Sequence, residues 1–189
     1  FSGNYGADGA GTTAYSVTTT NNTDSGLKDT ATGQNIYLFN TANGVEGRVG
    51  GSSGAVAFSV TISNGVVTLD QVRALVHPNT GDANDSLSLG GSKIALVATI
   101  TDGDGDHAST SIDLGGKLTF LDDGPSINLS GSSFEGLTVD ETHLNVDASS
   151  ANVASLFSGN YGADGAGSTT YNVTTTDNTD SGLKDTATG

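Results

Sequence analysis

Hydrophobic and polar residues alternate along much of the chain, in short runs that glycine-rich segments separate. In residues 55–63 the apolar side chains fall on every second position, and residues 93–101 repeat this pattern. A period of two places those side chains on one face of a β-strand. Both segments are therefore predicted strands with one face towards a core. The face residues are Val56, Phe58, Val60 and Ile62 in the first, and Ile94, Leu96, Ala98 and Ile100 in the second.

Turn signals join these runs into hairpins. Asn64-Gly65 separates residues 55–63 from the apolar run 66–69, and an Asn-Gly pair in this position is a strong hairpin signal. Residues 108–114 alternate again, with Ala108, Thr110, Ile112 and Leu114 on one face, before the turn Gly115-Gly116. Leu118 and Phe120 continue a strand, and residues 15–20, 36–39 and 137–139 are further predicted strands.

Two segments are less regular. Residues 69–77 fit a helical turn through Val72, Leu75 and Val76, or a strand through Val72, Ala74 and Val76, and we favour the strand. Residues 77–91 are predicted to form one long loop. Short alternating strands with glycine-rich turns are typical of an all-β, antiparallel, immunoglobulin-like β-sandwich.

The chain contains a long internal repeat. Residues 157–189 duplicate residues 1–33 with four differences, at an offset of 156 residues. Near-identity at such a period indicates tandem duplication of a whole domain. An immunoglobulin-type sandwich needs only roughly 100 residues, so the repeat must carry extra strands, long loops or a small subdomain. We expect the chain to be a fragment of a larger protein.

A domain junction is predicted near residues 122–125. Pro125 follows an acidic, glycine-containing cluster and cannot donate a ladder hydrogen bond from its own nitrogen. Residues 1–124 would then be most of one repeat, and residues 125–189 the start of the next. Two arrangements stay open: the first sandwich is incomplete, or strands are shared so that residues 1–156 close on themselves.

Charge and composition exclude several functions. Asp and Glu outnumber Lys and Arg by 21 to 6, giving a net charge of −15, which disfavours nucleic acids and anionic membranes as partners. No apolar run is long enough for a membrane-spanning helix. The chain has no cysteine, so neither a disulfide framework nor a thiolate metal site is available.

The densest acidic segment is DGDGD, which places Asp102, Asp104 and Asp106 between two predicted strands. Carboxylates this close repel one another unless a cation lies between them. A hard cation prefers oxygen ligands, and irregular geometry suits Ca²⁺, so calcium is the predicted cofactor. The alternative is a solvated acidic hairpin.

A second acidic group surrounds the predicted junction. Asp122 and Asp123, together with Asp140 and Glu141, are predicted to form a site that bridges two domains. The alternatives are a polar linker for the first pair and turn or helix capping for the second.

The remaining titratable residues are assigned other roles. Asp82 and Asp85 are expected to be turn formers or ligands. Asp8 and Asp164 are expected to be turn formers, with calcium binding as the alternative. Asp24, Asp29, Asp180 and Asp185 are expected to be solvated. Arg73 is expected to pair with an acid, and the three histidines lack the spacing of a zinc site.

The order of these motifs resembles a known class. The segments LDQVRALVHPNTGDANDSLSL, ITDGDGDHASTSIDLGG, LTFLDDGPSI and LTVDET are similar to the tandem repeats of giant type I-secreted adhesins of the repeats-in-toxin (RTX) class in Gram-negative bacteria. The resemblance implies an extender domain, stiffened by calcium, that projects distal binding modules from the cell surface in adhesion and biofilm formation. It also implies that the acids of DGDGD, DDGP and VDE line the metal sites. The glycine-rich nonapeptide runs of that class are not found in this sequence.

The functional hypothesis is therefore a structural spacer with neighbouring repeats of the same chain as its partners. It is located outside the cell, has no catalytic residues and forms no obligate oligomer. The alternative is a calcium-dependent module that binds carbohydrate or another surface through loop 77–91. A glycan hydrolase is disfavoured because the chain has only three glutamates and no recognisable catalytic pair.

Overall fold

The computed structural model describes residues 1–7 and 9–187, and within these ranges the chain is all-β, with antiparallel sheets and no α-helix. The strands are β1 (Ala10–Thr18), β2 (Thr23–Lys28), β3 (Asn35–Thr41), β4 (Gly44–Val49), β5 (Val56–Ser63), β6 (Val66–Gln71), β7 (Ser86–Ser88), β8 (Ala95–Asp102), β9 (His107–Asp113), β10 (Thr119–Leu121), β11 (Ser126–Leu129) and β12 (Phe157–Asn160). Short 3₁₀ helices lie at η1 (Gly115–Lys117), η2 (Glu141–His143) and η3 (Val153–Leu156). Asp8, a predicted turn former, lies outside the described residues.

The larger sheet is a meander of five strands in the order β2-β3-β4-β5-β6. The predicted hairpin at Asn64-Gly65 is confirmed: both residues have positive φ, 51° and 78°, as a tight two-residue turn between β5 and β6 requires. Gly47 on β4 lies opposite Phe58, and a Cβ at Gly47 would collide with the Phe58 ring. Glycine therefore lets this ring pack flat against the neighbouring strand.

The smaller sheet has the order β1-β8-β9, and a separate pair joins β10 to β7. The core lies between the two main sheets, where Val17 of β1 and Ile94 beside β8 pack with Ile36, Leu38 and Val60 of the larger sheet. Phe120 of β10 closes the cluster by packing against Phe58, with ring centroids 5.0 Å apart. Every buried residue in the described ranges lies within residues 17–120.

Several local predictions are wrong. Residues 69–77 form neither a helix nor one continuous strand, because β6 ends at Gln71. Within residues 69–77 only Leu75 is buried, and it forms an isolated bridge to Asp29. Residues 137–139 are not a strand. The predicted loop 77–91 contains the short strand β7, whose partner β10 lies over 30 residues later in the sequence.

The second part of the chain, residues 122–187, has a different character. Its only described ladder is the pair β11–β12, in which Ser126–Leu129 runs antiparallel to Phe157–Asn160. Residues 126–129 thus pair with the start of the second copy and add no strand to the sheets of the first part. No residue of this part is buried in the described ranges.

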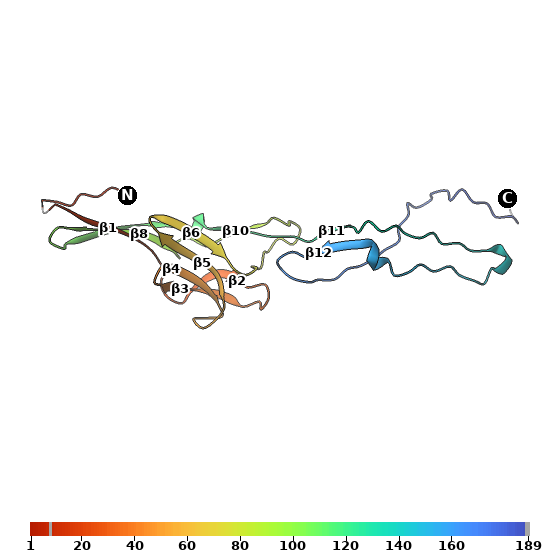
Figure 1. The fold of residues 1–189 in the computed structure, drawn as a ribbon, viewed down its shortest axis with the longest axis horizontal. Helices are drawn as coiled ribbons and strands as arrows, with labels where there is room; N and C mark the ends of the chain where they lie inside the picture. The colour runs from red at the N-terminus through yellow and green to blue at the C-terminus, as the bar shows by residue number, and fades with distance from the viewer. Residues whose placement is uncertain (8, 188–189) are drawn as a thin grey trace.

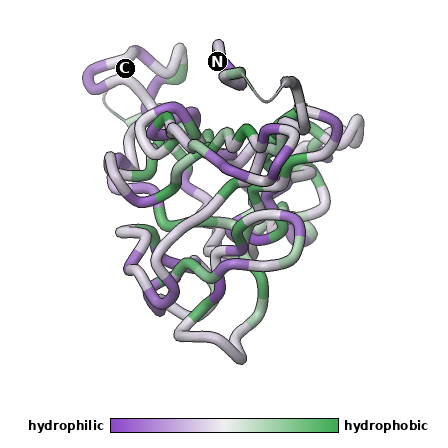
Figure 2. The backbone as a smooth tube through the Cα atoms, turned by 90° about the vertical axis from the view of Figure 1, so that its left-hand side faces the viewer, coloured by the Kyte–Doolittle hydropathy of each residue, from purple (hydrophilic) through white to green (hydrophobic). Residues whose placement is uncertain are grey.

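The molecule is elongated, with the first part at one end and the β11–β12 part at the other (Figure 1). The two termini lie towards opposite ends of the long axis (Figure 1). Viewed along that axis, short hydrophobic stretches alternate with hydrophilic ones along the backbone (Figure 2). In the described residues no helix has the length and apolar character that crossing a membrane requires.

Candidate metal centre

The hairpin between β8 and β9 positions the three aspartates of DGDGD. The ladder pairs Thr101 with His107, and the Asp102 N–H donates to the Asp106 carbonyl at 3.0 Å. Gly105 turns the chain with φ of 104°, a conformation that side chains other than glycine rarely adopt. The loop is therefore held at the end of a sheet rather than on a free tether.

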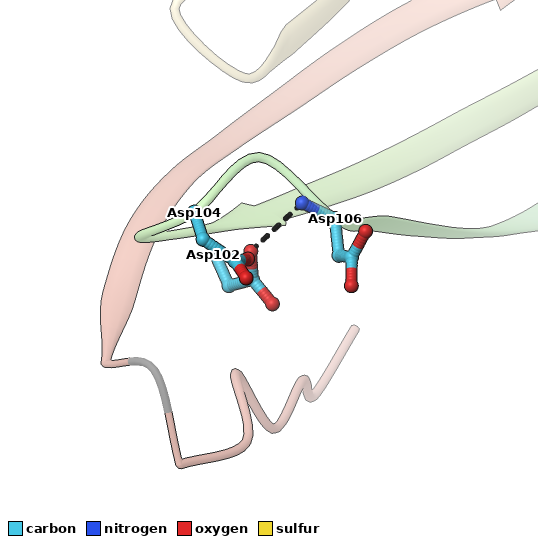
Figure 3. A group of neighbouring side chains, drawn as sticks. All are labelled: Asp102, Asp104 and Asp106. Atoms are coloured by element: carbon cyan, nitrogen blue, oxygen red, sulfur yellow. Dashed lines mark hydrogen bonds between the residues drawn. The ribbon is translucent and has the colours of Figure 1, made fainter.

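The three carboxylates converge. One oxygen from each of Asp102, Asp104 and Asp106 lies within 4.8 Å of the others. All three side chains lie on one side of the loop, facing the segment that precedes β1 (Figure 3). The Oδ1 atom of Asp102 accepts hydrogen bonds from the backbone N–H groups of Gly105 at 3.1 Å and Asp106 at 2.9 Å. These two bonds fix the Asp102 carboxylate.

The pKa of the Asp102 carboxyl is lowered. The largest cause is a side-chain hydrogen bond with Asp104, and backbone N–H donors from the loop add to it, while partial desolvation opposes the shift. Because the ordinary pKa of an aspartate is 3.8 and the shift is downward, Asp102 is ionised at neutral pH. An ionised carboxylate is the form that binds a cation.

The donor set fits a hard divalent cation. Two oxygens that each bind one Ca²⁺ at about 2.3–2.6 Å lie no more than about 5 Å apart. The three oxygens here, all within 4.8 Å of one another, satisfy this limit. The three aspartates also concentrate formal negative charge in a chain whose net charge is already −15. The triad could therefore hold a metal ion, as the sequence predicted for these residues.

Asp122 and Asp123 lie at the junction between the two parts of the chain. The Asp122 N–H donates to the Asp85 carbonyl at 2.8 Å, which ties the junction to the loop before β7. The Asp123 Oδ2 atom accepts from the Ala163 N–H at 3.1 Å. Asp123 therefore links the end of the first part of the chain to the GADG loop of the second copy.

Asp140 and Glu141 lie in a different place. The structure puts them at η2, at the far end of the second part, and does not gather them with Asp122 and Asp123 into a cluster of three acids within the described ranges (Figure 1). The Asp140 Oδ1 atom caps η2 by accepting from the Thr142 N–H at 2.8 Å. Hydrogen bonds from the Thr142 hydroxyl and backbone lower the pKa of Asp140. Capping, the alternative role, accounts for the position of Asp140.

The expectation that Asp29 is solvated is wrong. Its side chain is 1% exposed, and Arg73 pairs with it through Nε–Oδ1 and Nη2–Oδ2 contacts of 2.7 and 3.1 Å. The hydroxyl and N–H of Thr32 also donate to Oδ2. The Arg73 hydrogen bond is the main reason that the pKa of Asp29 is lowered. The prediction that Arg73 pairs with an acid is confirmed.

One structural acid was missed by sequence reasoning. Asp113, at the end of β9, accepts from the N–H groups of Gly115 at 2.9 Å and Ser92 at 2.8 Å. These two backbone donors, in that order, lower its pKa, and Lys117 adds a smaller attraction. The available signal was its place directly before the Gly115-Gly116 turn, where Asp commonly accepts backbone hydrogen bonds.

Comparison with known proteins gives one family and no individual relative. The searches of curated proteins and of solved structures each returned no match. A family model matches residues 1–115 and 136–189, and the interval between them contains the junction at residues 122–125. Because the matched segments cover most of the chain, the protein belongs to the family described as a domain of unknown function, DUF5801.

Proposed function

We propose that the chain is part of a tandem array of immunoglobulin-like β-sandwich domains that acts as a calcium-stiffened extender of a giant surface adhesin. The observation that carries this proposal is the convergence of three aspartates within 4.8 Å at the end of a sheet, in a chain that also repeats itself after 156 residues. Repetition provides length, and a cation at a domain end provides stiffness. The array would lie outside the cell, at the surface of a Gram-negative bacterium.

Calcium is the proposed ion because of the ligand chemistry. The triad offers carboxylate oxygens on a solvent-exposed loop, and no ring nitrogen belongs to the cluster among the described residues. Ca²⁺ accepts six to eight oxygens in flexible geometry, so water and loop carbonyls can complete its coordination. Mg²⁺ requires near-ideal octahedral geometry and gives up its water reluctantly.

The repeat also supports a position for the ion near a domain junction. Asp123 accepts from the Ala163 N–H, and a Cβ at Gly162 would lie 2.8 Å from the Asp123 carbonyl oxygen. The first copy has the same residues at Gly6 and Ala7. In that first copy, the preceding residues Asn4 and Tyr5 line the same hollow as Asp102 and Asp106. An array built by repeating this contact brings Asp123 of one unit close to the aspartate triad of the next.

Such a junction responds to calcium mechanically. Without a cation, the acids of consecutive units repel one another and leave the connection free to bend. A shared cation replaces repulsion with ligand bonds that fix the angle between units. The elongated shape, with termini towards opposite ends, supports a role in spanning distance (Figure 1).

Thermal unfolding with and without calcium tests the ion. An ion that binds only the folded state stabilises it by about 2.7 kcal/mol at 100 times its Kd. The melting temperature should therefore rise with calcium and fall with chelator, and Asp104→Asn should abolish most of the response. The matched control is Asp177→Asn, an exposed aspartate of the second copy. Equal calcium responses in both variants would rule out the triad as the site.

Solution scattering tests the extender role. A chain of two full periods should show a longer maximum dimension and a narrower distribution of shapes with calcium than with chelator. A glycan array with the same chain distinguishes the alternative, because a spacer should bind none of the glycans. Calcium-independent scattering would contradict the stiffening.

A further inference from the structure

The inner face of the three-stranded sheet is only half covered. The ladder aligns three rows of side chains on this face, and the row nearest the core includes Val17, which is buried. Towards the acidic loop, the same face carries Tyr15, Ile100 and Ala108. Tyr15 is exposed, and Ile112 on β9 is 44% exposed although its alternation predicts a core-facing position.

Residues 1–5 lie against this part of the sheet and cover it only partly, leaving a hollow beside them. The Phe1 ring packs against Tyr15 with centroids 6.0 Å apart, and a Cβ on Gly3 would lie 3.0 Å from Ile100 Cδ1. The hollow is lined by these residues together with Ala98, Ala108 and Thr110 from β8 and β9. In the described ranges residues 1–4 belong to no strand.

The second copy of the same residues does have a strand partner. Phe157–Asn160, identical to residues 1–4, forms β12 and pairs with β11. Its local packing matches the first copy, because the Phe157 and Tyr171 rings lie 5.7 Å apart. The Tyr161 hydroxyl also lies 2.7 Å from Thr169 Oγ1, as Tyr5 does from Thr13. The two copies therefore differ in their strand partners but share these local contacts.

The apolar side chains of β11 point to the side of the second copy on which, in the first copy, the three-stranded sheet lies. Leu129 lies opposite Phe157, and Ile127 lies opposite Gly159. Directly opposite residues of an antiparallel pair share a face. Since Phe157 faces Tyr171, as Phe1 faces Tyr15, Ile127 and Leu129 face the same way. These two side chains are 61% and 74% exposed in the present chain.

We propose that, in each unit of the array, the residues just before the copy of Phe1 supply a strand that completes the unit. A copy of Ser126–Leu129, preceding Phe1 by the repeat offset, would pair with residues 1–4 and fill the hollow on β8 and β9. Its isoleucine and leucine would cover Ile100 and Ala108. The exposed apolar residues of β11 and those of the three-stranded sheet are then two halves of one interface. The structural unit of the array runs from residue 125 of one repeat to residue 124 of the next.

The test adds residues 125–156 in front of Phe1, joined as they are joined to Phe157. We expect slowed hydrogen exchange at residues 2–4 and a rise in Tm of roughly 4 °C or more. The matched control carries I127D and L129D in the added segment only. These changes keep the length and the linkage but remove the apolar side chains that would cover the sheet.

Register is tested separately with cysteines, because the native chain has none. In the present chain Asn128 lies opposite Ser158, so Asn128→Cys with Ser158→Cys is the positive control. In the extended chain, Asn128→Cys of the added segment should form a disulfide with Ser2→Cys, and Ser126→Cys should not.

The outcomes decide the proposal without reference to calcium. Protection at residues 2–4, with the predicted disulfide, supports strand completion. Unchanged exchange and Tm would overturn it, as would an equal gain from the control with two aspartates. Exchange at β5, in the core, verifies that each variant is folded. Both tests are performed in chelator, so a failure of the calcium proposal leaves this result unaffected.

Discussion

The two copies of the repeated segment show the same residues in two tertiary contexts. Their local contacts agree closely: Gly26 N and Gly182 N each donate to the aspartate two residues earlier at 2.8 Å. Asn22 and Asn178 both adopt positive φ, 68° and 61°. These turns form wherever the sequence occurs, because their hydrogen bonds join residues only a few positions apart.

The long-range structure differs. In the first copy β1 pairs with β8 and β2 pairs with β3, whereas the corresponding residues of the second copy form no strand in the described ranges. Leu27 is 4% exposed, and its duplicate Leu183 is 83% exposed. We infer that residues close in sequence determine the turns of this chain, while its strands require partners from distant residues.

The largest expected difference between the copies concerns this leucine. Leu27→Ala should lower the free energy of unfolding by about 2–5 kcal/mol, because it leaves a cavity in the core. Leu183→Ala should change it by less than about 0.5 kcal/mol, because the side chain is exposed. Chemical denaturation of both variants measures the two effects. Similar losses would mean that the second copy also contributes to a packed core.

The buried ion pair provides the next comparison. Asp29→Asn should lower the free energy of unfolding by about 1–3 kcal/mol, because the substitution removes the buried negative charge that pairs with Arg73. Its duplicate Asp185 is exposed and accepts from Ala187 N at 2.8 Å. Asp185→Asn should therefore have a much smaller effect on the same denaturation curve. A large effect at residue 185 would place that residue in a folded unit.

The pH dependence of stability follows from the lowered pKa of Asp29. A carboxyl whose folded-state pKa lies below its ordinary value of 3.8 stabilises the fold above that value and loses the contribution as pH falls through the folded pKa. The difference in unfolding free energy between wild type and Asp29→Asn should thus be largest near neutral pH and shrink below about pH 4. A difference that stays constant down to pH 2 would contradict the assignment.

The smallest effect concerns the left-handed turn. Asn22→Ala should destabilise the chain by about 1 kcal/mol, because a residue with a Cβ other than Asn or Asp pays a steric cost at φ of 68°. Asn22→Gly should be close to neutral. Asn178→Ala should leave global unfolding unchanged, although it disturbs its own turn. Thermal melts of the three variants compare these effects, and destabilisation by Asn22→Gly equal to that by Asn22→Ala would refute the steric explanation.

The predictable parts of the fold share a local signal. Apolar and polar residues alternate strongly in residues 55–63 and 93–101. The Asn64-Gly65 pair predicts its hairpin from the local sequence alone. In contrast, β2 and β4 were not predicted, because TDSGLK and GVEGRV together contain only three large apolar residues and three glycines. Their burial depends on the sheet around them.

The candidate site divides in the same way. The aspartate triad was predictable because its three members lie within five residues of one another in sequence and share one turn. The burial of Asp29 was not, because Arg73 lies 44 residues away in sequence. The grouping of Asp140 with Asp122 likewise assumed a long-range approach that no local pattern encodes.

Calorimetric titration of the folded chain with calcium measures directly whether the aspartate triad binds the ion. We expect saturable binding to the wild-type chain and its loss in Asp104→Asn, with Asp177→Asn binding as the wild type does. Binding that persists unchanged in Asp104→Asn, or no binding to the wild-type chain, would contradict a calcium-stiffened array.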